Sequence, residues 1–195
     1  MDDPKPNSPA ARPSSIAPAN RVVFGQSFET LFRACGDPPR PEVLAAFRES
    51  GVDLDRLQVA YPLAAHLSVL GKVRQLLYPS LSDDEAFFLL GRAFIERYET
   101  TLMGRALLRL LPVLGTRRVI GRLTQSFRSA TNYVEAEAEE RGRGHFEIRI
   151  RPVRNPGFYR GILSAGLEVA GAKNLEIKLL GVEGEQISLD VRWTE

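Results

Sequence analysis

Cysteine and histidine are scarce in this chain, whose 195 residues include one cysteine, Cys35, and two histidines, His66 and His145. A single cysteine excludes an intramolecular disulfide and is typical of a protein in a reducing cytoplasm. A bound metal needs several convergent donors, and the sequence shows no close His/Cys/acid spacing. We therefore predict no metal site and a cytoplasmic location.

Long apolar runs and lysine are also missing. No apolar stretch reaches the length of a membrane span, and the N-terminus lacks the apolar core of a signal peptide. Lysine occurs at only four positions, so arginine carries almost all of the positive charge, and the formal net charge is +2. This charge is too small to require nucleic acid, and no basic motif interleaved with aromatic residues is present. We expect neither a membrane span nor a nucleic-acid partner.

The length of the chain suffices for one domain with a substantial core but is short for two. Residues 1–20 contain five prolines among serine, alanine and asparagine, with little to bury. This composition indicates a disordered Pro-rich leader. We predict a single domain over residues 21–195.

The middle of the chain has the apolar spacing of amphipathic helices. Ser82 and Glu85 form a capping box, in which each side chain satisfies a backbone amide of the other residue. A short strand is expected at 21–24. The predicted helices cover 27–35, 41–50, 62–77, the segment after Ser82, 103–111 and 117–128.

The pattern changes to that of strands near residue 133. Segments 133–139 and 145–153 alternate apolar and charged residues around a Gly-rich turn, which predicts a hairpin with Glu and Arg pairing across its outer face. Asn155 precedes a helix that begins with proline. A second hairpin starts near Leu175 and runs to Trp193. The fold class is therefore α+β, with a helical N-terminal half packed on a C-terminal ββαββ antiparallel sheet.

Three segments of the second half carry a resemblance to a known fold: Arg151-Pro152-Val153-Arg154, the helix opening at 158–163, and the terminal Val191-Arg192-Trp193. From about residue 133 to 193, the chain resembles the sheet subdomain of haem–nitric-oxide-binding (H-NOX) and vinyl-reductase-type domains. With the segment 23–28 included, the chain after residue 20 also resembles a paralogous family of proteins of unknown function that is abundant in myxobacteria. The resemblance implies an H-NOX-like fold.

Haem-binding members of this superfamily hold the haem propionates with a Tyr-x-Ser-x-Arg motif. The matching positions here are Ile150, Pro152 and Arg154, so that only the arginine is kept. The same members ligate iron with a helical histidine, whereas no histidine occurs here between residues 100 and 133. Iron needs an axial donor such as His, Cys or Tyr. The resemblance therefore implies a relative without the haem ligand, and we predict no cofactor.

Arginine is segregated along the sequence. No acidic residue occurs from 101 to 134, where six arginines include Arg118 and Arg122, and Arg149 and Arg154 follow. The planar guanidinium group makes bidentate contacts with phosphate or carboxylate, so these four residues are candidate ligands for an anion or nucleotide, with Arg154 first. A solvated face that binds nothing is the alternative.

Small side chains suggest a second candidate site. Ala136 and Ala138 fall on the inward face of a predicted strand, which indicates an apolar pocket between the helices and the sheet. The alternative is close packing of a helix there. The small residues from Gly161 to Gly166 predict that their helix approaches the sheet, or a second subunit, closely.

No general base, nucleophile or metal constellation of the kind that catalysis requires is visible. We therefore predict a non-enzymatic signalling or adaptor domain of a bacterium that senses a small molecule or binds a partner protein. For the oligomeric state of this domain, a homodimer is one of the possibilities that the sequence leaves open. Two other functions stay open, namely a regulator that binds an anion or nucleotide through the Arg-rich face, and an enzyme with an unrecognised site.

Overall fold

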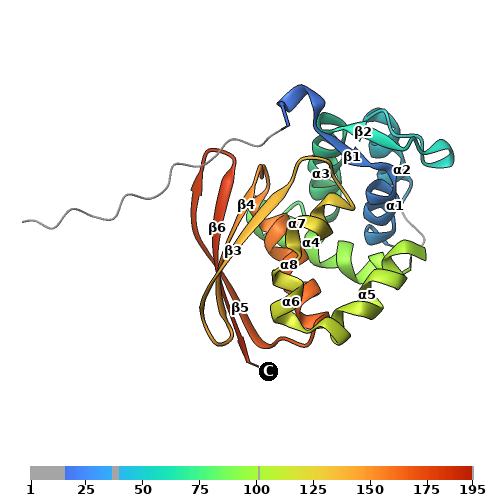
Figure 1. Ribbon diagram of the computed structural model, residues 1–195. Helices are drawn as coiled ribbons and strands as arrows, with labels where there is room; N and C mark the ends of the chain where they lie inside the picture. Colours follow the sequence, from blue (N-terminus) through green and yellow to red (C-terminus); the bar gives the residue numbers. More distant parts are fainter. Residues whose placement is uncertain (1–15, 37–39, 101, 195) are drawn as a thin grey trace, which may run out of the picture.

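The computed structural model describes residues 16–36, 40–100 and 102–194, which form a four-stranded sheet with helices packed against one face (Figure 1). The strands are β3 (Glu135–Gly142), β4 (His145–Arg151), β5 (Lys173–Glu183) and β6 (Gln186–Thr194). All neighbouring strands are antiparallel, in the order β3-β4-β6-β5. The predicted α+β class and the predicted ββαββ unit are confirmed.

The two faces of this sheet differ as the alternating sequence predicts. Phe146, Ile148 and Ile150 of β4 are buried against the helices, as are Ile187 and Leu189 of β6. On the other face, Glu and Arg pair between β3 and β4. Arg151 lies 2.8 Å from Glu137, and Arg149 lies 3.3 Å from Glu139.

Eight α-helices fall within the described part of the chain. They are α1 (Gly25–Ala34), α2 (Pro41–Glu49), α3 (Leu63–Leu77), α4 (Asp83–Tyr98), α5 (Leu102–Leu114), α6 (Thr116–Ile120), α7 (Leu123–Arg128) and α8 (Pro156–Val169). The capping box at the start of α4 is confirmed, because the Ser82 hydroxyl accepts from the Glu85 amide and the Glu85 carboxylate accepts from the Ser82 amide. The predicted helix over 117–128 is wrong as a single element, since Gly121 and Arg122 separate α6 from α7.

The N-terminal strand β1 (Val22–Phe24) pairs antiparallel with β2 (Ala60–Pro62), which the sequence did not predict. Residues 1–15 of the predicted leader lie outside the described residues. Its last part contains a 3-10 helix, η1 (Pro18–Asn20), and Ile16 packs against the core. A second 3-10 helix, η2 (Leu54–Arg56), precedes β2.

Helices α4 and α8 cross at glycines. A Cβ built on Gly161 would lie 2.1 Å from the carbonyl oxygen of Phe88, and one built on Gly91 would lie 2.1 Å from that of Phe158. The close approach predicted for the α8 segment is therefore present, but its partner is another helix and not the sheet. No helix in the described ranges has the length and apolar character needed to cross a membrane.

Candidate ligand cavity

An apolar cavity of about 450 Å³ is lined mainly by residues of α4, α5, α6, α7 and α8. Figure 1 shows where these helices lie relative to the sheet. The buried apolar side chains of the cavity lining come from four of these helices, α4, α6, α7 and α8, and form what we call its floor. They are Phe94, Val119, Leu123, Phe127, Leu163 and Leu167. This volume lies within the range of about 300–1,000 Å³ that is typical of small-molecule sites.

Aromatic contacts fix the walls of the cavity. The Phe94 ring lies 5.7 Å from that of Phe158 and stacks on Tyr98 at 6.1 Å, while the Phe127 ring lies 5.6 Å from that of Tyr159. Offset or edge-to-face aromatic pairs at such separations add stability beyond their buried area. The cavity is thus bounded by side chains that are themselves held in place.

Gly166 of α8 leaves room inside the cavity. It is one of the lining residues, and a Cβ built on it would meet no atom within 4 Å outside its own helix. Gly161 on the same helix has no such space. A larger side chain at Gly166 would therefore fill the cavity, whereas one at Gly161 would push α4 away.

The hydroxyl groups on the cavity wall bond to the protein itself. Ser27 donates to the carbonyl oxygen of Ala130 at 3.4 Å, and Ser126 donates to that of Arg122 at 3.2 Å. Tyr98 is hydrogen-bonded to Ser129, and burial raises the pKa of its phenol. The interior therefore offers a ligand mainly apolar surface.

The mouth of the cavity, where its lining residues are exposed, is mostly polar. The exposed lining residues are Leu110, Arg122, Gln125 and Ser126. Arg122 is the single charged residue on this wall, and no ion pair joins its guanidinium group to any residue that the structure describes. One of the arginines that the sequence singles out is therefore placed at the mouth of an apolar cavity.

The other predicted site residues lie elsewhere. Arg118 is exposed on α6 and does not line this cavity, and Arg149 pairs with Glu147 and Glu139 on the outer face of the sheet. Ala136 is half-buried, with its amide and carbonyl both bonded to the Thr124 hydroxyl at 2.8 Å. Ala138 is exposed. The cavity is therefore not at the two alanines, and a ligand-binding role for them stays a prediction.

Arg154, the first candidate of the sequence, pairs with Glu185 at 2.8 Å. Glu185 also accepts two hydrogen bonds from Arg21, which is buried. Arg154 and Glu185 line a second cavity of about 20 Å³, which has room for about one water molecule. Arg154, which matches the haem-binding motif, therefore lines a cavity too small for a ligand and already forms an ion pair with Glu185.

His66 lines the same small cavity and is 8% exposed. Its ring lies 5.4 Å from that of Phe28 and 6.1 Å from that of Phe158. Burial lowers the pKa of His66 from 6.5 to about 4, so the imidazole is neutral at pH 7. This is the environment of a core histidine.

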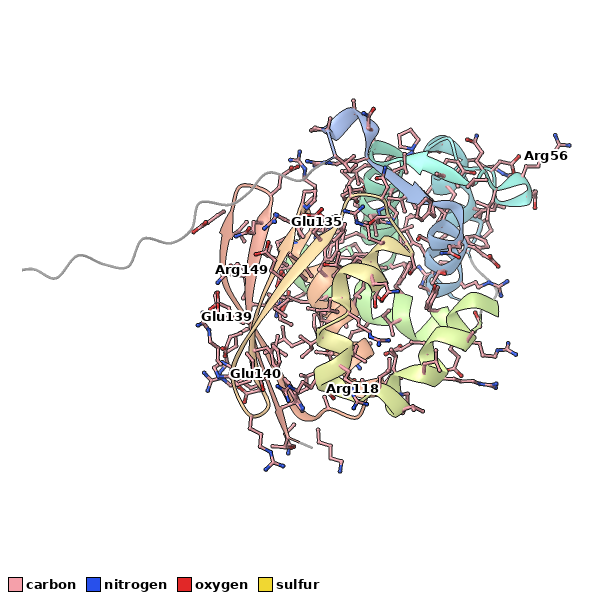
Figure 2. All side chains as sticks on the ribbon, in the orientation of Figure 1. Arg56, Arg118, Glu135, Glu139, Glu140 and Arg149 are labelled. Atoms are coloured by element: carbon pink, nitrogen blue, oxygen red, sulfur yellow. The ribbon has the colours of Figure 1, made fainter. Side chains whose placement is uncertain are left out.

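Two of the six arginines of the acid-free segment form ion pairs with glutamates of β3. Arg117 pairs with Glu140 at 2.6 Å, and Arg128 pairs with Glu135 at 2.9 Å. Figure 2 shows Glu135, Glu139 and Glu140 following one another along β3, with Arg149 beside them. The charge that is segregated in the sequence is thus partly neutralised in space, which leaves fewer free cations for an anion than the sequence suggests.

The sheet with strand order β3-β4-β6-β5 and the helices packed against one of its faces define an H-NOX-like fold. An H-NOX protein variant from S. oneidensis in the Fe(II) state superposes with a TM-score of 0.65 at 12% identity, covering 89% of this chain and 97% of that one. Unliganded Fe(II) H-NOX from K. algicida gives a TM-score of 0.58 at 12% identity, with the same coverage. An oxygen-binding H-NOX domain related to soluble guanylate cyclases gives 0.58 at 14% identity, covering 89% and 96%.

The chain belongs to the family described as protein of unknown function (DUF2378), whose family model matches residues 21–194. None of the curated proteins matches the sequence. The predicted relation to H-NOX domains is confirmed for the fold, and the predicted membership of a family of unknown function is confirmed as well.

The side chains around the apolar cavity among α4 to α8 do not fit a haem. Its lining contains neither histidine nor cysteine, and the remaining candidate donor is Tyr98. A haem-ligating tyrosine binds as the phenolate, which the raised pKa of this buried phenol disfavours. At the motif positions, Ile150 is fully buried in the core and Arg154 is engaged by Glu185.

Other reactive groups are isolated or buried. Burial raises the pKa of Cys35 to about 12, and its thiol donates to the carbonyl oxygen of Leu31. A thiol that stays protonated is neither a nucleophile nor a metal ligand. No three His, Cys, Asp or Glu side chains within the described ranges are grouped so that they could hold a metal ion.

Proposed function

We propose that this domain is a non-enzymatic sensor that binds an apolar small molecule, without haem, in the cavity among α4 to α8. The observation that carries the proposal is the cavity itself, about 450 Å³ in volume, with an apolar floor and internally satisfied hydroxyl groups. Transfer of an apolar ligand surface from water to such a floor is favourable by roughly 25 cal/mol per Å². The H-NOX-like fold supports the proposal by analogy only.

The chemistry of the remaining groups supports a binding role over catalysis. His66 is neutral beside a cavity with space for about one water molecule, and the Cys35 thiol is buried and protonated. Catalysis by a nucleophile or a general base needs such a group within reach of a substrate. These features favour a protein that signals by binding a ligand, and we propose that it does so in the bacterial cytoplasm.

Native mass spectrometry of protein freshly purified from its own host, together with solvent extraction and an absorption spectrum, tests the proposal. We expect an additional stoichiometric mass that is extractable into organic solvent, and no Soret band. A Soret band at full occupancy would contradict the haem-free account. A protein that carries no extra mass and also fails to bind the apolar dye Nile red would remove the sensing function.

One observation favours a second role, the binding of a partner protein. Strand β5 is an edge of the sheet and exposes Leu179, Leu180 and Val182, which are 38, 58 and 52% accessible. An exposed apolar edge strand can pair with another chain, including a second copy of this one. Light scattering after size exclusion, with Leu180→Lys for comparison, tests a homodimer through β5. If the natural protein is a dimer through β5, we expect the variant to be monomeric. Identical masses for the natural protein and the variant would exclude a dimer through this edge.

A further inference from the structure

We propose that the ligand is an anionic amphiphile with a single acyl chain, whose chain occupies the cavity and whose headgroup is bound by Arg122. This inference rests on the proposed function and adds the chemical class of the ligand. It is carried by the change in polarity along the cavity, from buried apolar side chains at its floor to the exposed Arg122 and Gln125 at its mouth.

The floor accepts an acyl chain and excludes a polar group. Phe94, Leu163 and Leu167 are buried there, and the neighbouring hydroxyl of Ser27 already donates to a backbone carbonyl. A buried polar group without a hydrogen-bond partner costs several kcal/mol in apolar surroundings. A nucleotide, whose base and phosphates all need partners, therefore does not fit this interior.

The mouth selects the headgroup by charge. Arg122 carries a permanent positive charge, and none of the described residues forms an ion pair with it. A guanidinium group binds a carboxylate or phosphate through two parallel hydrogen bonds, whereas it repels an ammonium group. Gln125 adds a neutral amide at the same mouth. An anionic headgroup would therefore supply the ion pair that Arg122 does not form with any described residue.

The surroundings of the mouth add to this preference. Helices α5, α6 and α7 have no acidic residue over 102–128, and Arg105, Arg109 and Arg118 are exposed on them. Figure 2 shows Arg118 in the lower part of the helical layer. Exposed like charges raise the local concentration of an anion, although salt screens this long-range effect. The apolar residue at the rim is Leu110, which is 54% exposed and can contact the chain where it enters.

Three amphiphiles of ten carbon atoms each, with different headgroups, test the proposal by displacing Nile red from the full-length protein. We expect decanoate to bind at least about tenfold more tightly than decylammonium, with decanol between them. Arg122→Gln is expected to weaken decanoate about tenfold and to leave decanol within about twofold. Arg118→Gln removes the same charge from a nearby position off the cavity wall, and we expect it to change decanoate binding by less than about twofold.

The outcomes separate this inference from the function on which it rests. Equal binding of all three compounds, unaffected by Arg122→Gln, would overturn the anionic headgroup and leave an apolar-ligand sensor standing. Failure of Nile red and of all three ten-carbon amphiphiles to bind would overturn the sensor itself. The free amphiphile is distinguished from a membrane lipid with phosphatidylglycerol vesicles. Binding to vesicles without binding of monomeric decanoate would overturn the proposal.

Discussion

Gly161 of α8 lies against Gly91 of α4 so closely that a Cβ on Gly161 would be 3.0 Å from the Cα of Gly91. The same Cβ would be 2.1 Å from the backbone oxygen of Phe88. Because both helices also contribute to the cavity wall, this glycine contact sets the separation of two of its sides. The two glycines of α8 thus have different effects. Gly161 allows α4 to pack closely against α8, whereas Gly166 leaves space within the cavity.

Gly161→Ala should separate α4 from α8 and destabilise the fold by about 3 kcal/mol, since the backbone atoms it meets cannot move aside as a flexible side chain would. Gly71 of α3 is the matched control, because a Cβ there meets nothing within 4 Å. Gly71→Ala should stabilise the helix by about 0.5–1 kcal/mol. Urea denaturation of both variants measures the difference. Equal stabilities would show that the helices do not cross as described.

Glu185→Gln should destabilise the protein by about 2–3 kcal/mol, because it leaves the buried Arg21 without its charged partner. Glu140→Gln breaks the Arg117–Glu140 pair, in which both side chains are exposed, and should cost less than about 0.5 kcal/mol. Chemical denaturation of the two variants in the same buffer tests the contrast. Similar losses for both would mean that Arg21 does not depend on Glu185.

His66 should make stability fall as the pH is lowered. Its pKa is about 4 in the folded protein against an ordinary value of 6.5, so the unfolded chain binds a proton between these values and the folded one does not. The contribution of neutral His66 to the free energy of unfolding is complete above about pH 6.5 and decreases below it. The decrease is about 2 kcal/mol on going from about pH 7.5 to about pH 5.

His66→Phe removes this titration and keeps an aromatic ring between Phe28 and Phe158. The difference in unfolding free energy between the natural protein and the variant should therefore change by about 2 kcal/mol across the same pH range. Taking this difference cancels the contribution of the carboxylates that both proteins share. A difference independent of pH would mean that His66 binds its proton over the same pH range in the folded and unfolded states, which would contradict the lowered pKa.

The sequence predicts those parts of the fold that depend on local patterns. The capping box at Ser82 and the alternation of β4 each depend on residues a few positions apart, and both are confirmed. Strand β2 has only three residues and ends in proline, so no alternation could reveal it. The break between α6 and α7 lies at Gly121, where the helical spacing of apolar residues continues across the gap.

The cavity could not be located from the sequence, because its walls come from segments as distant as Ser27 and Leu167. The alanines at 136 and 138 do not line this cavity, and their ligand-binding role stays a prediction, since small residues on an edge strand also occur where the strand is exposed. The absence of acidic residues around Arg122 singled it out in the sequence, and the structure places it on the cavity wall, where its binding role is a proposal. The pairing of Arg117 and Arg128 with β3 depends on tertiary packing and removes part of the apparent positive face.

The most direct test of the ligand cavity is Nile red binding to Gly166→Leu, measured beside Gly71→Leu. Both substitutions place a leucine on a helical glycine with free space, but only Gly166 lines the cavity. We expect Gly166→Leu to lose binding of the dye while remaining folded, and Gly71→Leu to bind it like the natural protein. Undiminished binding to folded Gly166→Leu would contradict the claim that this cavity holds the ligand.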